Sequence, residues 1–396
     1  PGRVKARSVG SLDCSSAIGS DRQVDVFQLD VVIDSVLRAF AAEAGLLHQP
    51  PAVQLTPREN EVVRLLASGM SVTQVADYLH RNGHQAIIIA PGPGEDSYNS
   101  TPVVRVAACS MPFYDDVRVG FSGTTVYRTL RSFKPDVVHL AAPLVLGGTA
   151  GRSARRMGIP VVAIFQTDIA GFARRYHLGK FAKPIWGAIR TAHASADLTL
   201  APSTITSWQL RENGLDDVAI WPRGVDAERF HPSKRDMDLH REWAPLGQTV
   251  VGYVGRLARE KEVERLRVLS GRPGIKLVIV GDGPLRSTLE KSMPDATFTG
   301  VLRGEELARA FATLDVFVHT GLNETFCQAI QEALASGVPV VGPAAGGPLD
   351  IIQHRQNGLL WSPEHPESLA GAVQQLHEDV LLRRLLASHG RTSVVG

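Results

Sequence analysis

The stretch HTGLNETFCQAIQEALASGVPVVGPAAGG, residues 319–347, combines a polar loop, a helical segment and a buried strand that ends in a glycine-rich turn. The apolar run Leu314–His319 predicts a strand that ends where this loop begins. Ala, Gln, Leu and Glu dominate Thr325–Ser336, and Gly337 follows, so we expect a helix that ends at this glycine. The stretch therefore predicts one strand–helix–strand unit of an α/β fold.

Two carboxylates mark this segment as a candidate site. Glu324 would lie at the start of the expected helix and Glu332 two turns further on, roughly 12 Å away along its axis. That distance is about the reach from the ribose of a nucleotide sugar, across its diphosphate, to its hexose. The backbone N–H groups of Thr325, Phe326 and Cys327 lie between the two carboxylates, and these donors suit a diphosphate. Two glutamates on a solvated helix are the alternative interpretation.

A basic segment about 65 residues upstream favours the site. The sequence VGYVGRLAREKEVERL predicts a buried strand at Val250–Val254, followed by Gly255, Arg256 and Lys261 and then a helix. Ligands of open α/β sheets bind beyond the carboxyl ends of the strands, where an arginine and a lysine can neutralise a diphosphate leaving group. An Arg and a Lys on a solvated loop are the alternative.

A third strand, in IKLVIVGDGPLRSTLE, leads into a turn with Gly281 and Gly283, which alone is a weak signal. In order, however, GRLxxxK, GDGP, NETFxxxxxEALASGxPVV, GGPxD and NGLL resemble the retaining glycosyltransferases of the two-Rossmann-domain (GT-B) fold. The resemblance runs from about Ser71 to about Leu386. The stretches GHQAIIIAPG, PDVVHLAAP, FQTDIAGFARRY, LAPST and RGVDAERFHP are similar to actinobacterial GDP-mannose-dependent α-mannosyltransferases that act on lipid-linked acceptors.

The resemblance implies a role for each of the residues above. Arg256 and Lys261 would hold the diphosphate and Glu332 the ribose diol. Glu324, with the backbone N–H groups that follow it, would bind the donor hexose and phosphate, and the three glycines Gly255, Gly281 and Gly283 would line the donor site. The reaction implied is transfer of mannose from GDP-mannose to a hydroxyl of a glycolipid acceptor, with retention, as in lipomannan or phosphatidylinositol mannoside synthesis. It requires no metal and no cofactor beyond the nucleotide sugar.

Alternating strands and helices fill residues 84–221, and a second series starts at Thr249. We therefore expect an α/β fold of two Rossmann-like domains facing a central cleft, with an acceptor-side domain at 71–222 and a nucleotide-sugar domain at 246–387. In the first domain Gln166 stands where the broad family often has a histidine that contacts the donor sugar, and Asp168 is either a sugar or acceptor contact or a helix cap.

Composition excludes some partners. A net charge of +2 argues against a protein that binds nucleic acid over its whole surface, and no apolar stretch is long enough to span a membrane. Three scattered cysteines indicate reduced thiols in a cytoplasmic protein. Basic and aromatic residues alternate in GFARRYHLGKFAKPIWGAIR, residues 171–190, and suit either the surface of an anionic membrane or an ordinary helix backed by the core.

Both ends of the chain depart from the family pattern. Residues 1–70 lack the ESFxPxxNGV start, whose loop reaches the donor phosphates, and Leu55–Leu79 resembles the first part of a LuxR-type helix-turn-helix. The basic recognition helix that should follow is replaced by a turn into a strand. At the other end the chain stops at Ser388–Gly396, before a helix that crosses back to the first domain. Two alternatives follow: a nucleotide-binding but inactive protein, and a DNA-binding regulator.

Overall fold

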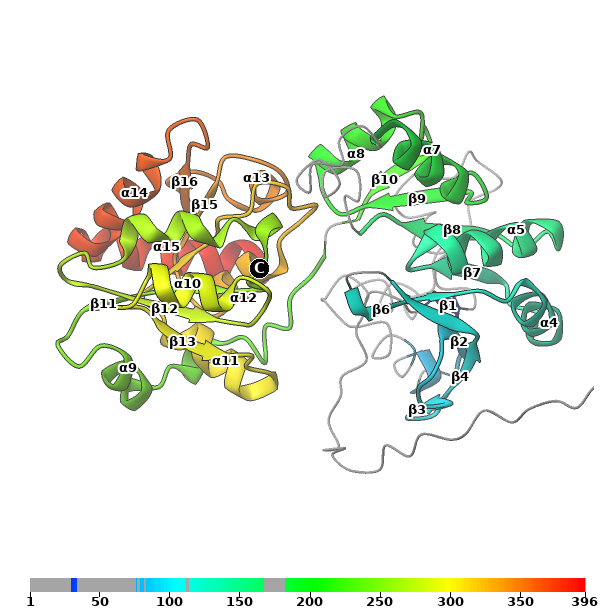
Figure 1. Ribbon diagram of the computed structural model, residues 1–396, viewed down its shortest axis with the longest axis horizontal. Coiled ribbons are helices and arrows are strands. Elements are labelled where there is room, and N and C mark those ends of the chain that lie inside the picture. The colour runs from blue at the N-terminus through cyan, green and yellow to red at the C-terminus, as the bar shows by residue number, and fades with distance from the viewer. Residues whose placement is uncertain are drawn as a thin grey trace, which may run out of the picture.

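The computed structural model describes residues 30–33, 76, 79–81, 83–111, 114–166, 182–221 and 223–395 of the 396-residue chain. These residues form two α/β halves, each built around its own large sheet, and Figure 1 shows the halves side by side. Most strands of both sheets are buried apolar runs, as expected for parallel sheets covered on both faces. The helix-turn-helix-like residues 55–75 and the candidate residue Asp168 lie outside the described part of the chain.

The N-terminal half is built on an eight-stranded sheet in the order β10-β9-β8-β7-β1-β2-β4-β3. Its strands are β1 (Asp30–Ile33), β2 (Ala86–Pro91), β3 (Ser97–Tyr98), β4 (Thr101–Val106), β7 (Val137–Leu140), β8 (Val161–Ile164), β9 (Leu198–Ala201) and β10 (Val218–Ile220). β7 to β10 pair in parallel, as do β2 and β4. The expected parallel series is thus confirmed, but β1 lies antiparallel between β2 and β7, and β3 is antiparallel to β4.

Helices connect the parallel strands of this half. They are α4 (Gly123–Phe133), α5 (Gly148–Arg156), α7 (Ala182–His193) and α8 (Thr204–Glu212), with a π-helical turn at Pro143–Gly147. Val126 and Leu130 of α4 are fully buried against β2 and β7, because the apolar positions recur at helical spacing. A hairpin of β5 (Ala108–Met111) and β6 (Tyr114–Gly120), which the sequence did not predict, leads into α4.

The C-terminal half contains a six-stranded parallel sheet in the order β13-β12-β11-β14-β15-β16. Its strands are β11 (Thr249–Val254), β12 (Ile275–Val280), β13 (Thr297–Gly300), β14 (Val316–Val318), β15 (Val340–Pro343) and β16 (Gly358–Trp361). Its helices are α9 (Met237–Trp243), α10 (Arg286–Ser292), α11 (Gly304–Thr313), α12 (Gln328–Ala335), α13 (Pro348–Ile351), α14 (Glu367–Glu378) and α15 (Val380–Val395). One hydrophobic core lies between the sheet and helices α11 and α12, and another lies between the sheet and α14. Helices therefore cover both faces of this sheet.

Two expected elements differ in detail. The helix expected to begin at Thr325 begins at Gln328, because Cys327 adopts a left-handed backbone conformation with φ 109° that interrupts helical geometry. The segment after Lys261 forms 3₁₀ turns at 259–261 and 263–269 rather than an α-helix.

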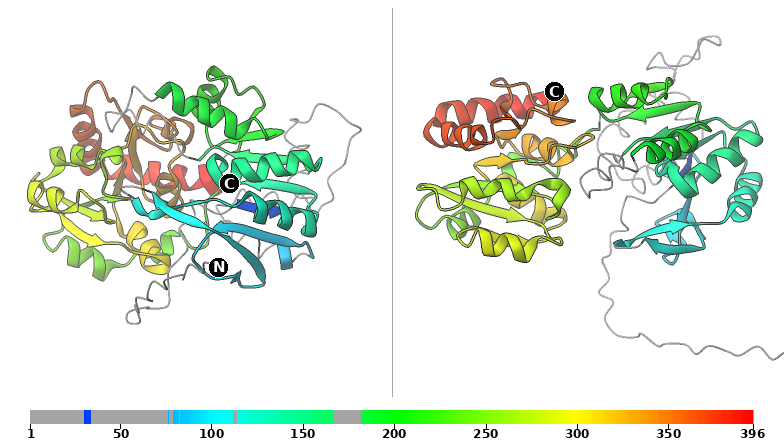
Figure 2. Two further views of the ribbon diagram at one scale, coloured as in Figure 1. Left: turned by 45° about the vertical axis from the view of Figure 1, so that its right-hand side comes forward. Right: turned by 45° about the horizontal axis from the view of Figure 1, so that its top comes forward.

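Helix α15 continues beyond the expected domain end at residue 387 as far as Val395. Arg391 of α15 donates to the backbone carbonyl of Ala335, at the end of α12. Figure 2 shows this red helix lying within the C-terminal half.

Candidate active site

Glycines allow the loops that follow β11 and β12 to touch backbone to backbone. A Cβ atom on Gly281 would lie 2.0 Å from the carbonyl oxygen of Gly255, and one on Gly283 would lie 2.5 Å from that of Leu257. Both glycines have positive φ, and the Leu257 N–H donates to the carbonyl of Asp282 at 2.9 Å. The two loops therefore form one closely packed edge at the carboxyl ends of the strands, the edge at which α/β sheets bind ligands.

The glycine pair after β15 packs in the same way against the loop after β14. The Gly347 N–H donates to the carbonyl of Glu324 at 2.8 Å, and a Cβ on Gly347 would lie 2.5 Å from the Cα of Phe326. Gly346 has φ 62°, and its Cβ would meet the carbonyl oxygen of Glu324 at 2.8 Å. Only glycine permits this approach, which fixes the backbone of residues 324–326 from behind.

A charged cluster links the loop after β11 to the loop after β14. Lys261 Nζ donates to Glu324 Oε1 at 2.7 Å, and the Thr320 hydroxyl donates to the Lys261 carbonyl at 2.7 Å. His319, whose side chain is 3% exposed, brings Nε2 to 3.2 Å from the same Glu324 oxygen. Among the described residues, neither ring nitrogen of His319 has a hydrogen-bond partner. The contact with Glu324 is therefore an ion pair whose geometry does not allow a hydrogen bond. Tyr253 stacks on the imidazole.

The charges of this cluster reinforce one another. Burial favours neutral Glu324, but His319 and Lys261 outweigh it and lower the pKa of Glu324 to about 2. Burial would lower the pKa of His319, yet Cys327 and Glu324 together raise it to about 10. Burial likewise opposes the charge on Lys261, and Glu324 raises its pKa above the usual value. Glu324 is therefore an anion between two cations at neutral pH.

Glu332 lies in a different environment on α12. Its side chain is half-buried and makes no hydrogen bond or ion pair with the residues that the structure describes. Burial raises the pKa of Glu332 to about 8, and the charge of Arg229 offsets only part of that shift. A half-buried carboxyl group without hydrogen bonds can accept them from the hydroxyl groups of a ligand.

Arg256 lies on the loop after β11, as Lys261 does. Its side chain is exposed, and its backbone carbonyl accepts a hydrogen bond from the Tyr253 hydroxyl at 3.2 Å.

The two halves meet at residues that the sequence singled out. The Thr325 hydroxyl donates to the backbone carbonyl of Gln166 at 2.8 Å. Gln166 is thus next to the loop that carries Glu324. His319 and Tyr253 were missed by the sequence reasoning, although the position of His319 at the carboxyl end of an expected strand was a usable signal.

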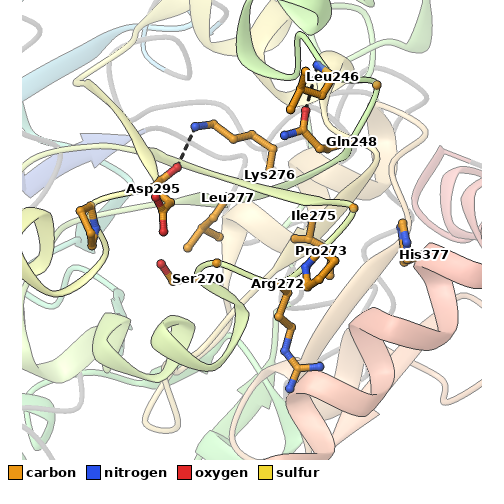
Figure 3. A pocket seen from close by; sticks show the side chains of 14 residues that line it. Leu246, Gln248, Ser270, Arg272, Pro273, Ile275, Lys276, Leu277, Asp295 and His377 are labelled. Carbon is orange, nitrogen blue, oxygen red and sulfur yellow. Dashed lines mark hydrogen bonds between the residues drawn. The ribbon is translucent and has the colours of Figure 1, made fainter.

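A surface hollow of about 830 Å³ lies elsewhere, at the amino ends of β11 and β12. Figure 3 shows Gln248, Lys276 and His377 among its lining side chains, and none of the candidate residues is there. In the described part of the chain, no helix is both long and apolar enough to cross a membrane.

Comparisons with known proteins show the family of the chain. Residues 68–229 match the model for Glycosyltransferase Family 4, and residues 248–379 match that for glycosyl transferases group 1. A GDP-mannose-dependent α-mannosyltransferase of Corynebacterium glutamicum is 49% identical over 78% of this chain and 76% of its own length. One from Mycobacterium tuberculosis is 47% identical over 82% and 87%.

A more distant relative and a solved structure extend the comparison. The GDP-mannose-dependent α-(1-6)-phosphatidylinositol dimannoside mannosyltransferase of Mycobacterium tuberculosis is 29% identical over 74% of this chain and 80% of its own. The crystal structure of Anabaena HepE in complex with UDP shares the fold, with a TM-score of 0.61 at 20% identity, over 74% of this chain and 80% of that one. With two Rossmann-like halves and relatives of this similarity, the chain belongs to the GT-B family of GDP-mannose-dependent α-mannosyltransferases.

Proposed function

We propose that this protein is a retaining mannosyltransferase that moves mannose from GDP-mannose to a hydroxyl of a glycolipid acceptor. The observation that carries the proposal is the Lys261–Glu324–His319 cluster at the carboxyl edge of the C-terminal sheet, because it keeps a carboxylate charged beside a cation. The relatives that support the donor are named for GDP-mannose, and one is named for a phosphatidylinositol dimannoside acceptor.

The candidate residues within the described part of the chain share the binding of the donor. Lys261 and the exposed Arg256 contact the diphosphate, and the half-buried Glu332 accepts hydrogen bonds from the ribose hydroxyls. The backbone N–H groups of Thr325, Phe326 and Cys327, which precede α12, donate to the phosphate, and the glycine-rich edge at Gly255, Gly281 and Gly283 lines the donor site. Glu324 holds a hydroxyl of the donor hexose, and Gln166 approaches the same sugar from the other half.

The chemistry is mostly electrostatic. As the bond from the anomeric carbon to the phosphate oxygen breaks, negative charge grows on the GDP leaving group. Lys261 and Arg256 neutralise this charge, and they stabilise the transition state more than the ground state. The acceptor oxygen bonds to the anomeric carbon on the face from which the phosphate leaves, and the leaving phosphate takes the proton of the acceptor hydroxyl, so configuration is retained. No side chain has to act as a base, which agrees with an uncharged Gln166 in the N-terminal half. No metal is required in this scheme.

The acceptor is a lipid, and the protein meets it at the surface of an anionic membrane on the cytoplasmic side. The described part of the basic segment, α7, supports this contact with the exposed side chains of Lys183 and Arg190. Its aromatic residue Trp186 is half-buried and stacks on Phe165 with ring centroids 6.2 Å apart, so it contributes to the core instead.

Transfer of radiolabel into a lipid extract tests the proposal. The chain is incubated with radiolabelled GDP-mannose or UDP-glucose, and Lys261→Ala serves as the inactive control. Label should enter lipid from GDP-mannose alone. Transfer from UDP-glucose alone would contradict the donor assignment. Tight GDP binding without any turnover would instead identify a nucleotide-binding protein that is catalytically inactive.

A further inference from the structure

The start of α8 in the N-terminal half is capped by a side chain of the C-terminal half. Ser203 precedes the helix, and its hydroxyl accepts from the Thr206 N–H at 3.2 Å. The Thr204 N–H has no acceptor within its own helix, because it lies in the first turn. Both this N–H and the Thr204 hydroxyl donate to the carboxylate of Asp350, in α13. A carboxylate at a helix N-terminus also interacts favourably with the helix dipole.

The same turn of α8 holds the loop that follows Glu324. The Thr206 hydroxyl donates to the carbonyl of Thr325 at 3.2 Å, and the Thr325 hydroxyl donates to the carbonyl of Gln166 at 2.8 Å. Thr325 is therefore fixed to the N-terminal half at its hydroxyl and at its carbonyl. Asp350 follows the glycine pair that packs against residues 324–326, and its N–H donates to the carbonyl of Gly347 at 3.0 Å, so it belongs to the same packed segment of the C-terminal half.

The contact is suited to opening and closing. Thr204 and Asp350 are both exposed, whereas Ser203 and Thr206 are buried. Water can replace the exposed hydrogen bonds when the halves separate, while the buried Ser203 cap keeps the helix start intact. Enzymes with two domains commonly close around their substrates through such contacts.

We propose that Thr204 and Asp350 are positioning residues for the transfer reaction. Their contact holds the two halves together so that Glu324 and Gln166 face one donor sugar. The expected change in kcat/KM rests on the proposed function, whereas the contact between Thr204 and Asp350 does not. Neither residue contacts the nucleotide in this scheme, because Lys261, Arg256 and Glu332 of the C-terminal half hold it.

Kinetics of four variants test the proposal. Asp350→Ala removes the acceptor, Thr204→Val removes the hydroxyl donor and Thr204→Ser restores it. Asp238→Ala is the matched control, since Asp238 is also an exposed first-turn carboxylate but belongs to α9 of the same half. We expect kcat/KM for GDP-mannose to fall about tenfold in Asp350→Ala and to fall in Thr204→Val. Thr204→Ser and the control should stay near the parent, and GDP affinity should change less than about twofold in all four.

A hydrogen-exchange measurement separates this proposal from the proposed function. The Thr204 amide should exchange slowly in the parent, measured without nucleotide, and become unprotected in Asp350→Ala, while the amides later in α8 stay protected. That result supports the contact even if the chain transfers no mannose. Unchanged Thr204 exchange in Asp350→Ala overturns the proposal. An equal loss of GDP affinity and activity also overturns it, because that result indicates a general structural defect. Full activity in both Asp350→Ala and Thr204→Val overturns it as well.

Discussion

At the scale of single residues, the candidate donor site combines two carboxyl groups whose pKa values shift in opposite directions. Glu324 is held charged by Lys261 and His319, with its pKa lowered to about 2, whereas burial raises the pKa of Glu332 to about 8. The two pKa values differ because the charged neighbours differ. Glu324 lies within 3.2 Å of two cationic side chains, whereas Glu332 has no ion pair among the described residues. In the proposed function, the Lys261 ammonium would therefore exchange the Glu324 carboxylate for a diphosphate oxygen when the donor binds.

Alanine variants of Lys261 and Glu332 should separate catalysis from binding. Lys261→Ala removes a charge that matters most as the leaving diphosphate becomes more negative, so kcat should fall further than donor affinity. Glu332→Ala should weaken donor and GDP equally, because the ribose is held throughout the reaction. Steady-state kinetics and GDP calorimetry measure both quantities. Equal losses of kcat and affinity in both variants would show that the roles are wrongly assigned, and no loss in either would remove the site.

Nucleotide binding should release a proton from Glu332 near neutral pH. With a pKa of about 8, this group is mostly protonated at pH 7, and ribose hydroxyls donate best to its ionised form. Binding of GDP should therefore tighten as pH rises from about 7 to 9. Calorimetry of GDP binding in buffers of different ionisation enthalpy counts the protons released. Glu332→Gln is the control, and an unchanged release in that variant would assign the proton to the phosphate or to another residue.

At the scale of elements, the site consists of loops after parallel strands, and glycines set their spacing. The sequence predicted the strands well, because buried apolar runs such as Val250–Val254 have few other interpretations. It placed the start of α12 three residues too early, at Thr325. The cause is tertiary: Gly347 packs on Phe326, and Cys327 takes a left-handed conformation that no local propensity of cysteine predicts.

The variant Gly347→Ala should damage the donor loop. Its Cβ would lie 2.5 Å from backbone atoms of Phe326, so the loop must shift, and we expect destabilisation of about 1–3 kcal/mol with a loss of GDP affinity. Gly371→Ala is the matched control, because it lies within α14 and its Cβ would meet nothing within 4 Å. The control should raise stability by up to about 1 kcal/mol. Chemical denaturation and GDP titration of both variants check this; equal behaviour would contradict it.

At the scale of the whole molecule, the fold could be predicted from motif order, but the contacts between the halves could not. Thr325 and Gln166 are 159 residues apart in sequence, and nothing local indicates that one donates to the other. Asp350 likewise caps a helix 146 residues away. Such pairs depend on how two separate sheets pack together, which residue periodicity does not encode. The same limit explains why His319 was missed, since its role depends on Glu324 and Tyr253 around it.

Acid should destabilise the N-terminal half before the C-terminal half. His139 and His193 are buried in the N-terminal half, and burial lowers the pKa of each to about 4. The unfolded chain, with histidine near pKa 6.5, then binds more protons than the native one, so stability falls as pH drops from about 6.5 to 4. The full loss is about 3 kcal/mol per histidine. His319 acts oppositely: its folded pKa of about 10 gives stability that is present below pH 6.5 and lost as pH rises through 10.

Urea unfolding from pH 7 to 4, followed by hydrogen exchange in each half, measures these effects. Protection in β7 and β9 should be lost at a higher pH than protection in β11 and β14. His139→Gln should reduce the acid-dependent loss of stability by about half, because a neutral amide cannot take up a proton and His193 remains. His365→Gln, at a histidine with a 71% exposed side chain, should leave it unchanged. Stability that stays constant between pH 6.5 and 4, or a C-terminal half that opens first, would show that these buried histidines do not control the acid response.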